Sequence, residues 1–470
     1  MMEKIIEARN LSFTYEENSK QILDNLQFDV DKGQVIYITG TSGSGKSTFL
    51  NVINGIINEV IEGKLTGSLS ICGRENLKIC ERSRFIGNVF QNPRSQFFTN
   101  NSTTELVFTM ENYGFSKEEM EKRISDLVST YDIEYLLDRA IHELSSGERQ
   151  FLALLTVVIM NPEVVVFDEP SANLDYGNSM RLSRRISHLK KEGKTILVAD
   201  HRCFYLKGLI DKVFLLADHK LQDIPSEEAF LNTTYGRRAL DLFGQKYDQK
   251  MIYTGKEKVA ELKNIYYKDI LKDISMEIKL GEITFIVGVN GVGKTTLARL
   301  ISNLIKPDEG QIWVDGQALY IMQDSDFQLF GASCIKELEL TSINKEENLD
   351  ALKKLNLYEL RDRHPQSLSG GEKQRLQLAI SMVSKNRVIL LDEPTSGLDE
   401  RSMKKVVDSI SSMRDRHGMV VISHDYEFIR MCADRIIYVD EGKIKEDFYL
   451  EEKNINRLEN IFKYMEEYYE

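Results

Sequence analysis

GTSGSGKS at residues 40–47 and GVNGVGKT at residues 288–295 decide the fold of this 470-residue chain. Both stretches fit the pattern GxxxxGK[ST], in which glycines let backbone N–H groups close around phosphate oxygens at the start of a helix. Each stretch follows a β-rich run, residues 34–39 or 283–287, and precedes a helix-like run. The sequence therefore predicts two strand, loop and helix units that each hold a nucleotide phosphate group.

The residue types in the two loops suit ATP with Mg²⁺ as the predicted cofactors. Lys46 and Lys294 are expected to reach the β- and γ-phosphates, while the hydroxyls of Ser47 and Thr295 are expected to reach Mg²⁺. The predicted nucleotide-binding residues of the loops are Gly40, Gly43, Gly45, Lys46, Ser47, Thr48, Gly288, Gly291, Gly293, Lys294, Thr295 and Thr296.

Composition predicts a folded chain with neither a membrane span nor a secretion signal. Hydrophobic residues make up 42% of the sequence and charged residues 29%, which is ordinary for a globular protein long enough for two or three domains. The net charge of −12 gives no support to nucleic acid as a partner. No apolar run reaches about 18 residues, and the five cysteines show no metal-binding spacing.

A second set of motifs follows each loop in the same order. Each set has a glutamine, a serine–glycine signature, an apolar run that ends in Asp-Glu, and a histidine. The first set is Gln91, residues 144–150 (LSSGERQ), residues 164–170 (VVVFDEP) and His201; the second is Gln323, residues 368–375 (LSGGEKQR), residues 388–394 (VILLDEP) and His424. An apolar run that ends in two acids predicts a buried parallel strand with carboxylates at its carboxyl end, where ligands bind in α/β sheets.

These motifs resemble those of ABC ATPases, and the resemblance covers nearly the whole chain as two tandem nucleotide-binding domains. It implies an α/β fold in which each P-loop NTPase domain has a mostly parallel sheet core, an antiparallel β subdomain and a helical subdomain. The expected first domain is residues 1–225, the linker 226–257 and the second domain 258–470. The second copy lacks most of the stretch that corresponds to residues 58–73, which predicts a trimmed β-hairpin region there.

The resemblance also implies a role for each motif residue. Expected metal ligands are Ser47, Gln91, Asp168, Thr295, Gln323 and Asp392. Expected catalytic residues are Glu169 and Glu393, which would orient and deprotonate the attacking water, and His201 and His424, which would contact the γ-phosphate. General-base assistance of this kind is commonly worth about 10²- to 10⁴-fold in rate.

In the family, the signature of one domain closes over the phosphate loop of the other, so the resemblance implies an intramolecular sandwich of two nucleotides. The signature residues expected to complete these sites are Ser145, Gly147, Ser369, Gly370 and Gly371. Ser146 stands where the family usually has glycine, which leaves the relative rates of the two sites open.

Tyr15 matches the aromatic residue that stacks on adenine in the family. The second copy has Asp269 at the corresponding position. Tyr266 or Tyr267 could take over the stacking role, but with comparable odds they are ordinary strand residues. Adenine selectivity is therefore predicted more firmly for the first site.

The stretches QNPRSQF (residues 91–97) and QDSDFQLF (residues 323–330) are similar to the extended Q-loops of energy-coupling factor importers, in particular their fused double ATPase. That resemblance implies a peripheral protein on the cytoplasmic face of the cell membrane. Its expected partners are an integral membrane scaffold subunit, whose coupling helices contact the Q-loop regions, and a separate membrane component that binds a vitamin or metal micronutrient. The alternative is a soluble tandem ABC ATPase that acts on ribosomes or nucleic acid. Those proteins usually carry a long charged linker or cysteine clusters, which this sequence lacks.

Two further stretches predict helices with ordinary roles. The apolar spacing from Ile455 to Tyr469 predicts a helix that packs on its own domain, with a partner contact as the alternative. Arg184, Arg185, Lys190 and Lys191 predict a solvated helix face.

Overall fold

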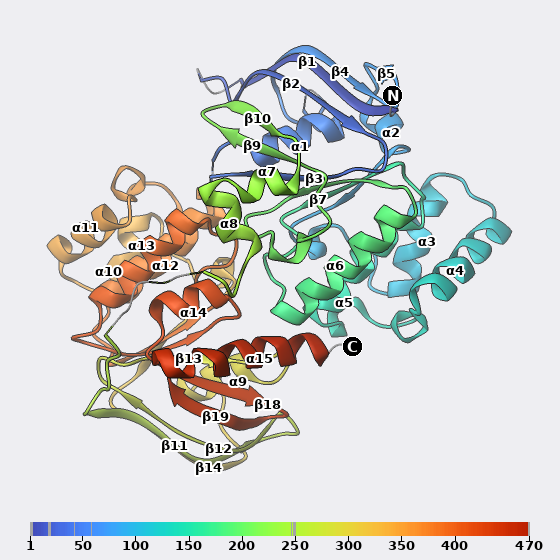
Figure 1. Ribbon diagram of the computed structural model, residues 1–470. Helices are drawn as coiled ribbons and strands as arrows, with labels where there is room; N and C mark the ends of the chain where they lie inside the picture. Colours follow the sequence, from blue (N-terminus) through green and yellow to red (C-terminus); the bar gives the residue numbers. More distant parts are fainter. Residues whose placement is uncertain are drawn as a thin grey trace. The chain divides into compact units, whose positions relative to one another are not determined.

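The computed structural model describes residues 3–16, 20–41, 43–57, 59–245, 247 and 251–468. The chain divides into two compact units, residues 1–174 with 178–242, and residues 175–177 with 243–470. Each unit contains a six-stranded sheet, a smaller antiparallel sheet and a set of helices (Figure 1). The predicted α/β fold with two tandem nucleotide-binding domains is confirmed.

The core of the first unit is a mostly parallel sheet of strand order β10-β9-β3-β8-β7-β6, in which β10 alone runs antiparallel to its neighbour. Its strands are β3 (Val35–Gly40), β6 (Ile86–Val89), β7 (Val164–Asp168), β8 (Thr195–Ala199), β9 (Lys212–Ala217) and β10 (Lys220–Ile224). β3 is buried along its whole length, as expected for a central strand covered on both faces.

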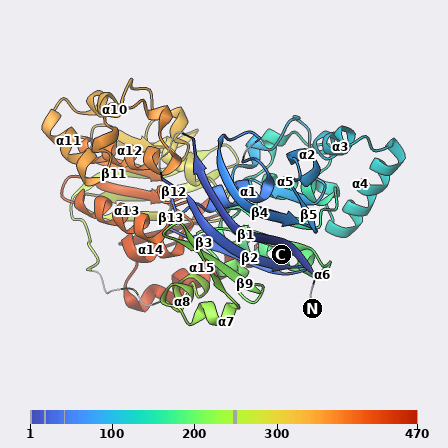
Figure 2. The same ribbon diagram turned by 90° about the horizontal axis from the view of Figure 1, so that it is seen from above.

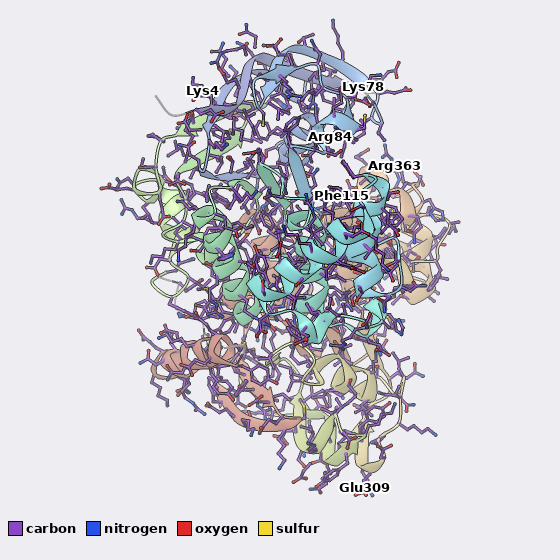
Figure 3. The ribbon with its side chains drawn as sticks, turned by 90° about the vertical axis from the view of Figure 1, so that its right-hand side faces the viewer. Lys4, Lys78, Arg84, Phe115, Glu309 and Arg363 are labelled. Carbon is purple, nitrogen blue, oxygen red and sulfur yellow. The ribbon has the colours of Figure 1, made fainter. Side chains whose placement is uncertain are left out.

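A four-stranded antiparallel sheet of order β2-β1-β4-β5 forms a second layer of the first unit. Its strands are β1 (Lys4–Tyr15), β2 (Leu23–Asp31), β4 (Gly63–Ile71) and β5 (Arg74–Glu75). The helices are α1 (Lys46–Asn54), α2 (Ile79–Arg82), α3 (Ser102–Asn112), α4 (Lys117–Tyr131), α5 (Ser146–Val158), α6 (Tyr176–Lys191), α7 (Glu227–Leu231) and α8 (Thr234–Leu240). In Figure 3, Lys4 and Lys78 lie at the antiparallel sheet, whereas Phe115 lies with the helices α3 and α4.

The second unit repeats the same core topology, with the strand order β15-β16-β17-β13-β18-β19. Its strands are β11 (Lys258–Tyr267), β12 (Leu271–Lys279), β13 (Ile283–Val287), β14 (Glu309–Val314), β15 (Ala318–Ile321), β16 (Val388–Asp392), β17 (Gly418–Ile422), β18 (Arg435–Asp440) and β19 (Lys443–Tyr449). Its helices are α9 (Lys294–Ile301), α10 (Cys334–Thr341), α11 (Lys345–Lys354), α12 (Gly370–Val383), α13 (Glu400–Ser412), α14 (Tyr426–Cys432) and α15 (Ile455–Glu467). Figure 2 shows α10 and α11 of this unit from above.

The antiparallel sheets of the two units differ in size. The sheet of the second unit has the order β12-β11-β14, and within the described residues it has no strand that corresponds to β5. Glu309, labelled in Figure 3, begins its edge strand β14. The shorter sheet agrees with the trimmed hairpin region that the sequence predicts for the second copy.

The interval 226–257, which the sequence suggests as a linker, contains the helices α7 and α8. Both helices belong to the first unit, which extends to residue 242. Residues 246 and 248–250 of this interval lie outside the described residues. Among the residues that the structure describes, no helix is both long enough and apolar enough to cross a membrane.

Two predictions about helix surfaces have different outcomes. Leu458, Phe462 and Met465 of α15 are buried, and the Phe462 ring packs 5.3 Å from the Tyr426 ring of α14 in the same unit, so the prediction that this helix packs on its own domain is confirmed. The solvated face predicted for α6 is wrong for two of its four basic residues. The Arg185 guanidinium stacks 3.3 Å from the centre of the Phe151 ring, and Lys190 is half-buried. Long basic side chains can pack their alkyl stems and planar groups against apolar surface. The number of charges in a helix does not show whether they do so.

An aspartate fixes the start of the phosphate-loop strand in both units. Asp211 Oδ2 accepts a hydrogen bond from the backbone N–H of Val35 at 2.8 Å, and Asp434 Oδ2 accepts one from Ile283 at 2.9 Å. The Asp434 side chain is fully buried and forms an ion pair with Arg414, whereas the Asp211 side chain is 34% exposed. Loss of Asp434 would leave the backbone N–H of Ile283 without its acceptor and would remove the carboxylate partner of the partly buried Arg414, whose guanidinium would keep, among the described residues, only its hydrogen bond to the Gly281 carbonyl oxygen.

We therefore expect Asp434→Ala to lower the free energy of unfolding of the second unit by about 3–5 kcal/mol, because breaking a buried ion pair strands its partner. The only tryptophan of the chain, Trp313, lies in β14 of this unit, so its fluorescence during urea unfolding reports the effect. Asp211→Ala is the matched control and should cost about 1–2 kcal/mol, read by circular dichroism. An unchanged fluorescence midpoint for Asp434→Ala would contradict the assignment.

Candidate functional site

The two phosphate loops have the backbone that anion binding requires. Gly43 and Gly45 have φ values of 78° and 97°, and Gly291 and Gly293 have values of 88° and 106°, a region that favours glycine. A Cβ atom on Gly40 would lie 2.3 Å from the Leu216 carbonyl oxygen, so the loop approaches β9 too closely for a side chain. The helices α1 and α9 begin at the loop lysines, which places their free N–H groups at the loop.

The loop lysines supply a buried positive charge. Lys294 is 7% exposed, and its Nζ donates hydrogen bonds to the carbonyl oxygens of Gly288 at 2.7 Å and Val289 at 2.8 Å. Lys46 Nζ donates to the Gly40 carbonyl oxygen at 2.9 Å. Burial lowers the pKa of Lys294. A cation beside a ring of backbone N–H donors is the arrangement that holds a polyphosphate.

The acidic pairs stand at the carboxyl ends of β7 and β16, as the sequence predicts. Both glutamates have positive φ values, 45° for Glu169 and 50° for Glu393, which residues other than glycine rarely adopt. The backbone N–H of Glu169 donates to the Ala199 carbonyl oxygen at 2.7 Å, and that of Glu393 donates to the Ile422 carbonyl oxygen at 2.9 Å. Such strain persists where neighbouring structure fixes it, and it is commonest at functional sites.

The aspartates of the pairs lie in different polar surroundings. In the second unit, Asp392 Oδ2 accepts hydrogen bonds from Thr295 Oγ1 at 2.9 Å and from the Tyr320 hydroxyl at 2.8 Å. In the first unit, burial and the negative charges of Glu169 and Asp200 raise the pKa of Asp168 to about 6. Burial raises the pKa of Asp392 as well. The sequence does not indicate that Tyr320 belongs to the site, because an aromatic residue in a strand usually packs in the hydrophobic core.

The two histidines reach the glutamates that the sequence predicts to be catalytic. His424 Nδ1 lies 2.7 Å from Glu393 Oε1, and His201 Nε2 lies 3.3 Å from Glu169 Oε1. His424 Nε2 and His201 Nδ1 are buried and have no hydrogen-bond partner within the described residues. An orphaned ring nitrogen beside the phosphate loop suits a contact with a phosphate oxygen, because a buried polar atom is stable only when paired.

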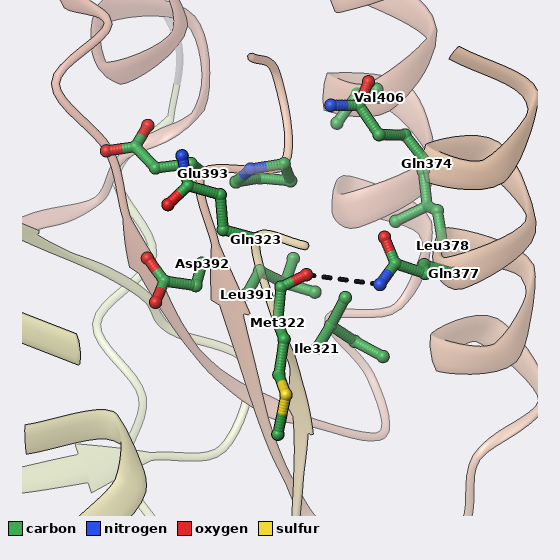
Figure 4. A pocket seen from close by; sticks show the side chains of 11 residues that line it. Ile321, Met322, Gln323, Gln374, Gln377, Leu378, Leu391, Asp392, Glu393 and Val406 are labelled. Carbon is green, nitrogen blue, oxygen red and sulfur yellow. Dashed lines mark hydrogen bonds between the residues drawn. The ribbon is translucent and has the colours of Figure 1, made fainter. Parts of the chain in front are cut away.

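Each Q-loop glutamine also comes close to its acidic pair. Gln91 Nε2 donates a hydrogen bond to Glu169 Oε2 at 2.6 Å. In the second unit, Gln323 lines a pocket together with Asp392 and Glu393 (Figure 4). Gln377 of α12 forms another wall of this pocket and donates a hydrogen bond to the Met322 carbonyl oxygen at 3.2 Å. The pocket therefore joins the acidic pair to the signature helix.

A second glutamine closes each Q-loop. Gln96 Oε1 accepts a hydrogen bond from the backbone N–H of Phe90 at 3.3 Å, and Gln328 Oε1 accepts one from Met322 at 3.0 Å. Gln96 Nε2 also donates to a carbonyl oxygen of α5 at 2.9 Å, and Gln328 Oε1 accepts a bond from Gln377 of α12 at 3.2 Å. Both units thus tie the Q-loop to the helix that begins at the signature.

The signature serines begin those helices with the same cap. The backbone N–H of Ser145 donates to Glu148 Oε2 at 2.7 Å, and that of Ser369 donates to Glu372 Oε2 at 2.8 Å. A Cβ atom on Gly147 would lie 2.4 Å from Asn178 Oδ1, so this glycine has a packing reason as well. A Cβ atom on Gly370 would meet nothing within 4 Å, and Gly371 is nearly as open, with no atom closer than 3.8 Å. Ser146, the counterpart of Gly370, therefore occupies a position that tolerates a side chain.

The predicted adenine-stacking residue of the first unit lies next to the phosphate loop. The Tyr15 hydroxyl and Thr48 Oγ1 are 2.8 Å apart, and the Tyr15 ring packs edge-on against Phe13 at 4.8 Å between centroids. In the second unit, Asp269 lies in the turn after β11, and the neighbouring strand residue Tyr266 is 39% exposed. The structure therefore agrees with the predicted difference: an aromatic ring lies beside the first phosphate loop, whereas Asp269 has the corresponding position in the second unit.

The residues present fit ATP with Mg²⁺. Backbone N–H groups, a buried lysine and an orphaned histidine nitrogen suit phosphate oxygens. The hydroxyls of Ser47 and Thr295, the carboxylates of Asp168 and Asp392, and the amide oxygens of Gln91 and Gln323 are the hard oxygen ligands that Mg²⁺ prefers. Within the described residues, no group of three or more histidine, cysteine or acidic side chains is arranged to hold a metal.

The raised pKa of Asp168 predicts that Asp168→Asn stabilises the first unit in EDTA. Because the pKa in the folded protein lies above the usual 3.8, the charged form destabilises the fold above about pH 6, and the effect vanishes below about pH 4, where both states are protonated. The gain at pH 7.5 should reach up to about 3 kcal/mol, since one pKa unit is worth about 1.4 kcal/mol. Thermal unfolding at pH 4 and pH 7.5 measures it, with exposed Asp126→Asn as the control. An equal gain at both pH values would rule out this cause.

Comparison with known proteins agrees with the site. The sequence profile described as ABC transporter matches residues 23–172 and 271–396. A Treponema denticola protein named as an ABC transporter ATP-binding protein is 36% identical, over 98% of this chain and 99% of that protein. A Methanosarcina mazei protein with the same description is 30% identical, over 94% of this chain and 95% of that protein. A solved structure of an archaeal ribosome recycling factor in complex with the ribosomal stalk protein aP1 superimposes with a TM-score of 0.65. The match covers 96% of this chain and 92% of that chain at 23% sequence identity, which shows a shared fold.

The profile matches cover more than half of the chain, and each match contains one phosphate loop and one acidic pair. The relatives extend over nearly the whole length of both units. Together with the two phosphate loops and acidic pairs, these matches lead to one conclusion: the chain belongs to the ABC transporter family, as an ATP-binding and ATP-hydrolysing protein with two tandem ABC domains.

Proposed function

We propose that this protein energises a membrane importer of the energy-coupling factor type, for a vitamin or metal micronutrient. It would act at the cytoplasmic face of the membrane, bound to an integral membrane scaffold subunit through its Q-loop regions. A separate membrane component would bind the substrate. Nucleic acid is not an expected partner, since the net charge is −12.

The observation that carries the proposal is the exposure of large apolar side chains directly after the first Q-loop and on the second. Phe98 in the first unit is 76% exposed, and Phe327 and Phe330 in the second are 68% and 76% exposed. Leu340 and Ile343, which follow in α10 and after it, are 72% and 89% exposed. Exposed apolar residues mark interaction surfaces when they gather in one region. Phe98 and Phe330 each lie seven residues after the Q-loop glutamine of their unit.

The chemistry assigned to the site follows from its contacts. When bound, Mg²⁺·ATP supplies a terminal phosphoryl group that water can attack. We propose that Glu169 and Glu393 orient this water and accept its proton, with His201 and His424 beside them on the γ-phosphate side. The 2.7 Å contact between His424 Nδ1 and Glu393 Oε1 supports this pairing. Tyr15 would stack on adenine in the first site.

We also propose that the two nucleotides bind in an intramolecular sandwich, in which the signature of each domain completes the site of the other. The residues assigned to this closure are Ser145, Gly147, Ser369, Gly370 and Gly371. The open space at Gly370 and Gly371 supports the assignment, because a phosphate could approach the start of α12 there.

The importer proposal predicts what the protein retains from native cells. A tagged Glu169→Gln/Glu393→Gln variant, held in ATP and Mg²⁺, should recover small, very hydrophobic integral proteins from detergent-solubilised membranes. The same purification from cytosol should recover none of them. Mass spectrometry of both eluates identifies the partners. Recovery of ribosomes or nucleic acid without membrane proteins would reject the importer and favour the alternative role.

The exposed Q-loop aromatics give a sharper prediction. Phe98→Asp combined with Phe330→Asp should reduce the recovered membrane proteins at least about tenfold, because buried aromatic anchors dominate binding at protein interfaces. Leu304→Asp is the control, since this side chain is 56% exposed but lies after α9, outside both Q-loops. Equal recovery from the double variant and the control would place the scaffold elsewhere on the surface.

A further inference from the structure

Tyr320 holds the aspartate of the second site in a way that has no counterpart in the first. The Tyr320 side chain lies in β15 and is 6% exposed, and its hydroxyl donates a 2.8 Å hydrogen bond to Asp392 Oδ2. Asp392 is 4% exposed. A hydrogen bond to a charged carboxylate in a buried setting is stronger than one between neutral groups, so this contact fixes the orientation of the Asp392 side chain.

Two donors from different elements converge on one oxygen of Asp392. Thr295 Oγ1, from α9, reaches the same Oδ2 at 2.9 Å, and no described residue donates a hydrogen bond to Oδ1. If Thr295 turns its hydroxyl toward a metal, Tyr320 still holds Oδ2. The second oxygen, Oδ1, then remains free and oriented for a metal ion or a metal-bound water.

The first unit has the same backbone at this place but not the same contact. Asn88 precedes Gln91 by three residues, as Tyr320 precedes Gln323. Asn88 pairs with Val166 of β7 in the same register in which Tyr320 pairs with a residue of β16. Asn88 Oδ1 is buried without a hydrogen-bond partner, and no described residue donates a hydrogen bond to the Asp168 carboxylate.

We infer that Tyr320 is a positioning residue for the metal of the second site, so that the second site needs less Mg²⁺ than the first to bind nucleotide. The inference rests on the proposed Mg²⁺ role of Asp392. Partners that orient a metal-binding carboxylate typically contribute 10- to 100-fold to metal affinity. Because Tyr320 acts through Asp392, its loss should change the metal requirement without changing nucleotide binding in the absence of metal.

The test reads each site separately in the full chain. Lys46→Ala leaves the second loop as the site measured, and Lys294→Ala leaves the first. In the Lys46→Ala background, Tyr320→Phe should raise the Mg²⁺ concentration for half-maximal binding of a fluorescent ADP on the order of tenfold. Its affinity for the same ADP in EDTA should stay within about twofold. Mn²⁺ counted by electron paramagnetic resonance gives the bound metal directly, without hydrolysis.

Asn88→Ala in the Lys294→Ala background is the matched control. Its Mg²⁺ requirement should stay within about twofold of its parent, because Asn88 makes no contact with Asp168 to lose. An unchanged Mg²⁺ requirement in Tyr320→Phe would overturn the inference. So would an equal loss of ADP affinity in EDTA and in Mg²⁺, which would reveal a merely structural role. If ADP binding by the Lys46→Ala parent does not respond to Mg²⁺ and the parent binds no Mn²⁺, the assignment of Asp392 to the metal is wrong as well. The importer proposal is tested separately, by the purification from native cells.

Discussion

A hydrogen bond between a strand's first N–H group and a partly or fully buried aspartate fixes the start of the strand that leads to the phosphate loop in each domain. Asp211 and Asp434 each bind the start of the central strand, β3 or β13. That strand lies beside the one that leads to the histidine, which in turn lies beside the strand of the acidic pair. Parallel neighbours in fixed register end at one edge, so loop, acids and histidine meet there. A slip of one residue would turn these side chains to the opposite face.

Much of this arrangement could be predicted from the sequence. The strand at residues 283–287 has the bounds that its apolar run suggests, because a glycine-rich loop follows it directly. The motif residues Gln91, Glu169 and His201 meet because they end strands of one sheet. Other contacts carry no sequence signal. Tyr320 looks like any strand aromatic, and Arg185 looks like a solvated charge, because composition does not show where a hydroxyl or a guanidinium finds its partner.

The two domains share the topology of their core sheets and differ in buried polar groups. Tyr320 bonds to Asp392, whereas Asn88 at the same place has a buried oxygen without a partner in the described residues. Asp200, just before His201, accepts hydrogen bonds from the Tyr205 hydroxyl and the backbone of Ser171, while the second domain has a serine before its histidine. Each difference concerns a residue that contacts or adjoins a motif residue. The motifs of the two domains are therefore equivalent in sequence, although the two sites have different surroundings.

The left-handed backbone at both predicted catalytic glutamates bears on how a duplicated chain can diverge. After a gene duplicates, a domain released from hydrolysis can accept any residue that relaxes its fold, and glycine or asparagine would relieve the strain at φ values of 45° and 50°. Both domains have glutamate at this position. Glutamate at both positions is the less stable choice for the polypeptide, which agrees with a requirement for the carboxylate in both domains.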